Sequence, residues 1–223
     1  MNQEQALSLL KETKLVAILR GIPVKQATDI ATALYDGGVR VLEFTFDHDD
    51  PDCVAHNCQR IRAVKKIFGD EMVVGCGTAL TVQEVEASVE AGGQIVISPN
   101  VDVSVIAKTK ALGAISMPGA LTPTEIVMAY NAGADIVKLF PAGTLGVPYI
   151  KAVRGPLGYI PMSAVGGVRP ETIADFLNVG VCGLGVGGEL VKKEFVRSGD
   201  MNALTSRARK FVHAIEQWEA NRS

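Results

Sequence analysis

A lysine lies in the middle of an otherwise apolar run, Asp135-Ile136-Val137-Lys138-Leu139-Phe140-Pro141. Burial of an ammonium group without a partner is costly, and the usual outcome is a lowered pKa that leaves the amine neutral. A neutral lysine amine is a nucleophile that attacks carbonyl groups to form Schiff bases. The alternative is a lysine on the solvent side or at the edge of a strand, with a surface role only.

Two more charged residues occur in apolar segments. Glu43 follows Val41-Leu42, and Arg20 ends the run 15–20. A glutamate near a reactive lysine can transfer protons, and a guanidinium suits a substrate carboxylate. A structural Glu43–Lys138 ion pair and a surface salt bridge of Arg20 are the alternatives. Buried pairs add little net stability because desolvation opposes their attraction, so function explains such a pair better.

Paired glycines follow two of the last apolar runs. Gly166-Gly167 leads into a predicted helix with Pro170 in its first turn, and Gly187-Gly188 ends the run 182–187. Backbone amides after neighbouring strands, beside a helix N-terminus, bind phosphate in barrel enzymes. Tight turns that need glycine are the alternative explanation.

Short β-branched runs alternate with amphipathic stretches along the whole chain. The predicted strands are 15–20, 40–46, 73–78, 94–99, 114–118, 135–140, 160–165 and 182–187. The predicted helices include 2–12, 24–36, 52–68, 81–91, 102–111, 122–131, 170–179 and about 200–220. Strict alternation predicts an α/β fold, a (β/α)8 TIM barrel with an extra N-terminal helix. A doubly wound open sheet is the alternative. No linker divides the chain, so we expect a single barrel domain over residues 1–223.

Active sites of such barrels lie at the carboxyl ends of the strands, where alternate side chains point inward. The residues predicted there include Arg20, Glu43 and Lys138, with Phe140 two residues after Lys138 on the same face. Thr78 follows Gly77 at the end of the third strand. Packing alone does not explain why an arginine, a glutamate and a lysine should all lie at the same end of the barrel.

Composition bounds the function. The 223 residues carry a net charge of −2 with a pI near 6.0, which argues against nucleic acid as a partner. No 18-residue apolar stretch is present and the N-terminus is polar, so we expect no membrane span and no signal peptide. The four cysteines form no CxxC pair, which fits a cytoplasmic protein.

An acidic segment, Asp47-His48-Asp49-Asp50, follows the second predicted strand. It could hold a metal ion, but its spacing matches no defined ligand motif. A solvated loop with a helix N-cap around Asp50-Pro51 explains it better. We therefore expect no metal.

Several segments occur together in one order: Val-Ala-Ile-Leu-Arg-Gly (16–21), Val-Leu-Glu-Phe-Thr (41–45), Gly-Cys-Gly-Thr (75–78), Ile-Ser-Pro-Asn (97–100), Met-Pro-Gly (117–119), Val-Lys-Leu-Phe-Pro (137–141) and Gly-Gly-Val (166–168). In this the chain closely resembles the class I KDPG/KHG aldolases. These enzymes cleave 2-keto-3-deoxy-6-phosphogluconate (KDPG) or 4-hydroxy-2-oxoglutarate (KHG). The resemblance covers about residues 5 to 220.

The resemblance implies a role for each matching residue. Lys138 is the expected Schiff-base lysine and Glu43 the general acid/base, while Arg20 and Thr78 bind the pyruvate carboxylate. The other expected substrate-binding residues are Pro99, Gly119, Phe140, Gly166, Gly167, Gly187 and Gly188. The resemblance also implies a lyase without cofactor or metal, a small-molecule 2-oxo acid as its partner, and a homotrimer.

The expected reaction is cleavage of 2-keto-3-deoxy-6-phosphogluconate to pyruvate and glyceraldehyde 3-phosphate. Three positions depart from the family pattern: Val165 replaces a common threonine, Gly188 a common serine, and Asp47 an arginine of some members. An acidic loop disfavours a phosphate dianion nearby. Aldolases for 4-hydroxy-2-oxoglutarate or 2-keto-3-deoxy-6-phosphogalactonate are therefore alternatives. So are a phosphate-binding barrel isomerase or synthase, in which Lys138 only pairs with an anion, and a catalytically silent barrel.

Overall fold

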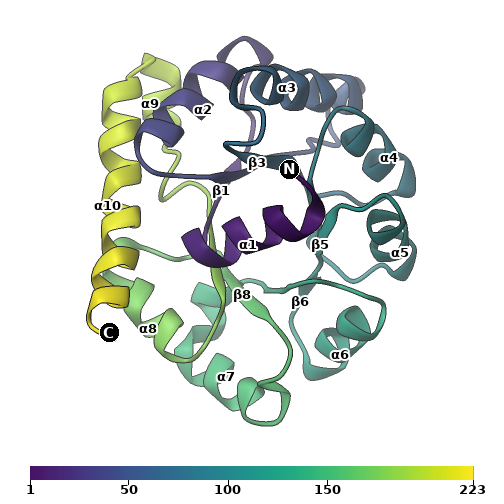
Figure 1. The fold of residues 1–223 in the computed structure, drawn as a ribbon, viewed down its shortest axis with the longest axis vertical. Coiled ribbons are helices and arrows are strands. Elements are labelled where there is room, and N and C mark those ends of the chain that lie inside the picture. Colours follow the sequence, from purple (N-terminus) through teal and green to yellow (C-terminus); the bar gives the residue numbers. More distant parts are fainter. Residues whose placement is uncertain (223) are drawn as a thin grey trace.

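A computed structural model describes residues 1–222, in which parallel strands roll into a barrel surrounded by helices (Figure 1). Neighbouring strands follow the order β5-β4-β3-β2-β1-β9-β8-β7-β6, and every pairing is parallel. The strands are β1 (Leu15–Leu19), β2 (Val41–Thr45), β3 (Val73–Gly77), β4 (Ile95–Ile97), β5 (Ile115–Met117), β6 (Gly119–Ala120), β7 (Val137–Leu139), β8 (Met162–Val165) and β9 (Gly183–Val186). The predicted (β/α)8 barrel is confirmed.

The strand predicted at 114–118 is present as β5, and a further short strand that was not predicted, β6, follows Pro118. Proline has no backbone N–H for a ladder, so a pairing strand tends to break there. β5 pairs with β4, whereas β6 pairs with β7. The N–H of Lys138 donates to the carbonyl of Pro118 at 2.8 Å. β5 and β6 thus share one place in the ring, which keeps eight strand positions.

Helices surround the barrel, most of them between consecutive strands, and α1 lies across one end (Figure 1). They are α1 (Gln3–Thr13), α2 (Ala27–Asp36), α3 (Cys53–Phe68), α4 (Val82–Glu90), α5 (Val103–Ala111), α6 (Pro123–Asn131), α7 (Ala142–Leu157), α8 (Ile173–Asn178), α9 (Lys193–Ser198) and α10 (Met201–Ala220), with short 3-10 turns at Val24–Gln26 and Pro170–Thr172. The non-helical backbone of Gly146 interrupts α7. α1 confirms the predicted extra helix, and α10 the predicted long last helix.

α1 closes the amino-terminal end of the barrel and crosses the centre of the view in Figure 1. Its Ala6 and Leu10 are fully buried against barrel residues that include Val16, Val41 and Ile136. Burial of one leucine side chain contributes about 1.5–3 kcal/mol. With this end filled by apolar side chains, the space available for a ligand lies at the opposite end, where the strands finish.

Most of the apolar core lies between the barrel and its helices. Strand residues that alternate with the inward ones, such as Ala17 and Leu42, pack outward against α2 and its neighbours. In the described residues, no helix is long and apolar enough to cross a membrane.

Candidate active site

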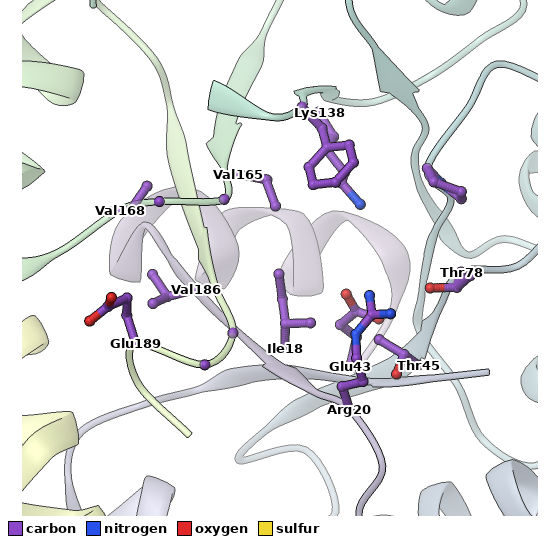
Figure 2. Close-up of a pocket in the computed structure, with 16 residues that line it drawn as sticks. Ile18, Arg20, Glu43, Thr45, Thr78, Lys138, Val165, Val168, Val186 and Glu189 are labelled. Carbon is purple, nitrogen blue, oxygen red and sulfur yellow. The ribbon is translucent and has the colours of Figure 1, made fainter. Parts of the chain in front are cut away.

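A cavity of about 430 Å³ opens at the carboxyl ends of the strands (Figure 2). Ten of the eleven predicted site residues line it. The complete lining is Ile18, Arg20, Glu43, Thr45, Thr78, Pro99, Lys138, Phe140, Val165, Gly166, Gly167, Val168, Val186, Gly187, Gly188 and Glu189. Figure 2 shows two ends: Lys138, Glu43, Arg20, Thr45 and Thr78 gather at one, and Val165, Val168, Val186 and Glu189 lie towards the other.

Lys138 projects from β7 into the first of these ends and is only 7% exposed. Its inward direction follows from strand alternation, since the neighbouring Val137 and Leu139 belong to the outer core. Its Nζ lies 4.8 Å from the centre of the Phe140 ring. Burial lowers the pKa of Lys138; the carboxylate of Glu43 opposes this effect and Arg20 adds to it. The net lowering favours the neutral, nucleophilic amine.

Glu43 projects inward from the middle of β2 and is 1% exposed. Its Oε2 has no hydrogen-bond partner. Burial raises the pKa of Glu43 from 4.5 to about 7, although the positive charges of Lys138 and Arg20 act in the opposite direction. A carboxyl group with a pKa near neutrality can both accept and donate a proton at physiological pH.

Gly77, the last residue of β3, makes the room that the Glu43 carboxylate occupies. A Cβ added at Gly77 would lie 1.2 Å from Oε2 of Glu43. We therefore expect Gly77→Ala to turn the carboxylate away from the lysine and to lower kcat by about 10²-fold, which is what a displaced general base costs. Steady-state kinetics measure this loss.

Gly155→Ala is the matched control for that substitution, because a Cβ added at Gly155 in α7 meets no atom within 4 Å. We expect the control variant to keep wild-type kcat. Full activity of Gly77→Ala would contradict the assignment of Glu43 as the proton-transfer group.

Arg20 and Thr78 lie beside the lysine and the glutamate. Arg20 comes directly after β1, and Thr78 directly after β3. Thr78 has a φ of 57°, in the left-handed region. A β-branched residue with such a φ is an outlier, and backbone strain of this kind is concentrated at functional sites. Figure 2 shows both side chains at the lysine end, where a guanidinium and a hydroxyl could bind a carboxylate.

Gly119 is the one predicted site residue that does not line the cavity. It lies in β6, where an added Cβ would come within 2.3 Å of the carbonyl oxygen of Pro99. Pro99 itself lines the cavity. Gly119 therefore affects the site indirectly, because its lack of a side chain permits the close approach of Pro99.

The other end of the cavity combines glycines with apolar walls. The predicted Gly166, Gly167, Gly187 and Gly188 lie here. Gly166 and Gly167 have φ values of 90° and 74°, which L side chains rarely adopt. A Cβ at Gly167 would also come within 2.9 Å of the backbone of Gly143. Consecutive backbone amides of this kind can form a concave site for an anion.

Six lining residues were not among the predicted site residues: Ile18, Thr45, Val165, Val168, Val186 and Glu189. Ile18 lies two residues before Arg20 and shares its face, so strand alternation could have identified it. Glu189 follows Gly188 and forms an ion pair with Arg207 at 3.4 Å. No pattern in the sequence assigns the carboxylate of Glu189 to the cavity.

Side chains of the acidic segment after β2 pair with their surroundings. His48 Nε2 lies 2.7 Å from Oε1 of Glu84, and His56 Nδ1 lies 2.7 Å from Oδ2 of Asp50. The N-cap predicted around Asp50-Pro51 lies one residue further along the chain, at Asp52, after which α3 begins. Asp47 does not line the main cavity but borders a smaller one next to Arg20.

A parallel barrel with a buried lysine and a buried carboxylate at its carboxyl-terminal mouth defines an enzyme of the class I aldolase type, in which a lysine amine attacks a ketone. Comparisons with known proteins give the family. The model for KDPG and KHG aldolases matches residues 7–207. This chain belongs to the KDPG and KHG aldolase family, and it is a class I aldolase, a lyase that acts on small-molecule 2-oxo acids.

Individual relatives agree with this assignment. The chain is 36% identical to a probable 2-dehydro-3-deoxy-6-phosphogalactonate aldolase of Rhizobium meliloti (strain 1021), over 81% of this chain and 83% of the relative. It is 32% identical to the KHG/KDPG aldolase of Escherichia coli (strain K12), over 95% and 96%.

Two solved structures are also similar. A native KDPGal structure aligns with a TM-score of 0.83 and 32% identity, over 92% of this chain and 96% of that one. A cube-shaped protein cage designed by fusing symmetric oligomeric domains aligns with a TM-score of 0.85 and 32% identity, over 95% of this chain and 75% of that one. The family resemblance seen in the sequence is confirmed.

Proposed function

We propose that this aldolase cleaves the C3–C4 bond of a 2-keto-3-deoxy-6-phospho sugar acid and releases pyruvate and glyceraldehyde 3-phosphate. The observation that carries the proposal is the Lys138 amine, buried, with a lowered pKa, beside a glutamate whose pKa is near 7. The cavity of about 430 Å³ has room for an acid of this size.

Lys138 and Glu43 divide the chemistry between them. The neutral amine of Lys138 attacks the C2 ketone, and protonation of the resulting hydroxyl by Glu43 releases water and leaves a cationic iminium. Glu43, now a carboxylate, takes the proton of the C4 hydroxyl. The electrons of the C3–C4 bond then move to the iminium, which gives the aldehyde and an enamine of pyruvate.

Glu43 returns its proton to C3 of the enamine, directly or through a water molecule, and hydrolysis of the iminium frees pyruvate and the lysine. One group therefore serves several proton transfers. Each such transfer by a positioned group is typically worth about 10²–10⁴-fold in rate.

The remaining lining residues bind the two ends of the substrate. Arg20 and Thr78 bind the carboxylate next to the reacting ketone, and Pro99 and Phe140 shape the pyruvate pocket. The phosphate would lie against the backbone amides of the four glycines at the far end: Gly166, Gly167, Gly187 and Gly188. Ile18 lies between the two ends and Val165 and Val186 lie towards the glycine end (Figure 2), and none of these side chains offers a hydroxyl to the substrate.

The configuration at C4 gives a second candidate. The chain is 36% identical to the relative named as a phosphogalactonate aldolase and 32% identical to the one named as a KHG/KDPG aldolase. We therefore propose 2-keto-3-deoxy-6-phosphogluconate and its galactonate epimer as the two substrates to compare.

We also propose that residues 1–223 act as one barrel domain and assemble as a homotrimer. The similarity to a component of a cage made from symmetric oligomeric domains supports assembly. Apolar side chains on the outer surface support it too, since Met128, Tyr130 and Tyr159 are 48%, 38% and 64% exposed. The two tyrosine rings pack edge to face at 5.7 Å. Exposed apolar groups that adjoin one another, as these two rings do, are typical of protein interfaces.

Trapping and a coupled assay test the reaction. Borohydride with pyruvate is expected to attach the reduced pyruvate adduct to Lys138, which peptide mass spectrometry locates. A lactate dehydrogenase assay follows pyruvate release. The substrates are both phosphorylated epimers, their unphosphorylated forms and 4-hydroxy-2-oxoglutarate. We expect turnover of the phosphorylated acids to exceed that of the free acids. Absence of an adduct would contradict the Schiff-base mechanism, and a preference for free acids would contradict the phosphate assignment.

A further inference from the structure

Thr78 needs contacts that keep it in its strained conformation. Its φ of 57° is unfavourable for a β-branched residue, and such a conformation persists only where the surrounding structure over-determines it. The hydroxyl of Thr78 reaches the lysine end of the cavity from this conformation (Figure 2). A relaxed backbone would aim the side chain elsewhere.

Glu84, in the first turn of α4, makes the contacts that hold the segment after Thr78. Its Oε2 accepts hydrogen bonds from the backbone N–H of Leu80 at 2.6 Å and of Thr81 at 3.0 Å. The N–H of Glu84 in turn donates to Oγ1 of Thr81 at 3.2 Å. Glu84 is 5% exposed, so these charge-assisted bonds are sheltered from water.

The second carboxylate oxygen of Glu84 reaches a different loop. Oε1 lies 2.7 Å from Nε2 of His48, in the loop that follows β2. β2 carries Glu43, the proton-transfer group. The ring of His48 also contacts that of Phe46, with 6.1 Å between the centres. One buried side chain therefore connects the loop after the general base to the loop that presents Thr78.

We propose that Glu84 is a positioning residue for substrate binding: it fixes the 78–81 segment in the conformation that directs the Thr78 hydroxyl at the substrate carboxylate. This inference rests on the proposed function, which gives Thr78 its role. Glu84 does not line the cavity, so it acts through Thr78 rather than on the substrate. The competing explanation is that Glu84 only caps α4.

The chain contains a matched control that separates these explanations. Glu125 makes the same capping box at the start of α6, and its Oε2 accepts from the N–H groups of Leu121 at 2.9 Å and Thr122 at 2.7 Å. No cavity-lining residue immediately precedes this box. Removal of Glu125 therefore measures the effect of losing a cap alone.

The test measures the pyruvate concentration that gives half-maximal borohydride trapping, by intact mass, together with the Tm of each variant. We expect Glu84→Ala to raise this concentration by about 10-fold or more, as for loss of a charge-assisted carboxylate contact. Glu84→Gln keeps an acceptor oxygen for Leu80 and Thr81, and is expected to stay within about threefold of wild type. Glu125→Ala is expected to leave the concentration unchanged, although both Ala variants lose the N3 carboxylate of a capping box and should show a similar fall in Tm.

Each result has a defined consequence. No adduct in the wild-type protein would overturn the proposed function and, with it, the role of Thr78. If the wild type forms the adduct and Glu84→Ala needs the same pyruvate concentration for half-maximal trapping, the positioning role alone is overturned. An equal rise of this concentration in Glu84→Gln and Glu84→Ala would also overturn it. If Glu84→Ala does not fold, Glu84→Asp withdraws the oxygens by one methylene group. A rise of about threefold or more in that variant supports the proposal, and no change overturns it.

Discussion

Lys138→Met is expected to lower kcat by about 10⁴-fold or more, because loss of a covalent nucleophile removes the whole route through the iminium. Methionine has nearly the same length and suits an apolar, buried position beside Phe140. Steady-state pyruvate release measures the loss, and borohydride trapping is expected to give no adduct at all.

The fold is expected to survive this change. Burial lowers the pKa of Lys138, so below the ordinary lysine pKa of 10.5 the buried amine opposes folding. At pH 7 the Tm of Lys138→Met should therefore equal or exceed that of the wild type. Lys151→Met changes an exposed lysine in α7 and should keep full activity. Retained turnover in the Lys138 variant would refute the assignment of the nucleophile.

Strand alternation made much of this site predictable. Side chains two residues apart in a strand share a face, which places Lys138 and Phe140 together. The same rule places Glu43 inward from β2. Once alternating strands and helices indicate a barrel, these residues must meet at its carboxyl-terminal mouth. The sequence thus predicts which residues meet, because this depends only on the fold class and on local geometry.

The protonation states could not be predicted in the same way. Glu43 favours a charged lysine, whereas burial favours a neutral one, and the balance depends on how completely the barrel excludes water. In the structure, burial lowers the pKa of Lys138 and raises that of Glu43 to about 7. Such a balance is a property of the packed interior and not of residue order.

Contacts between loops were also beyond sequence reasoning. His48 and Glu84 are 36 positions apart, in the loop after β2 and in the first turn of α4, so no local pattern connects them. The indirect place of Gly119 behind Pro99 likewise depends on how closely two backbones approach. Residues that support a site rather than line it are recognised only after packing is known.

Glu43→Gln is the second change with a large expected effect. Glutamine keeps the shape of the side chain but can neither accept nor return a proton at neutral pH, so kcat should fall by about 10²–10⁴-fold. In the wild type, kcat/KM should fall as the pH rises through about 7, because Glu43 then loses the proton that it must donate to the carbinolamine hydroxyl. The variant should lack this inflection, and a pH profile that keeps it would assign the titration to another group.

The same substitution should stabilise the protein at high pH. The pKa of Glu43 is raised from 4.5 to about 7 in the folded state, so between these pH values the unfolded chain loses a proton that the folded protein keeps. The contribution of Glu43 to wild-type stability therefore falls across this window, by at most about 3 kcal/mol, and stays constant above it. Glutamine does not titrate, so Glu43→Gln should exceed the wild type in urea unfolding at pH 8 by more than it does at pH 4.5. An identical difference at both pH values would show that the buried carboxyl does not carry the raised pKa. A gain in stability with a loss of activity is the result expected of a group whose costly burial serves catalysis.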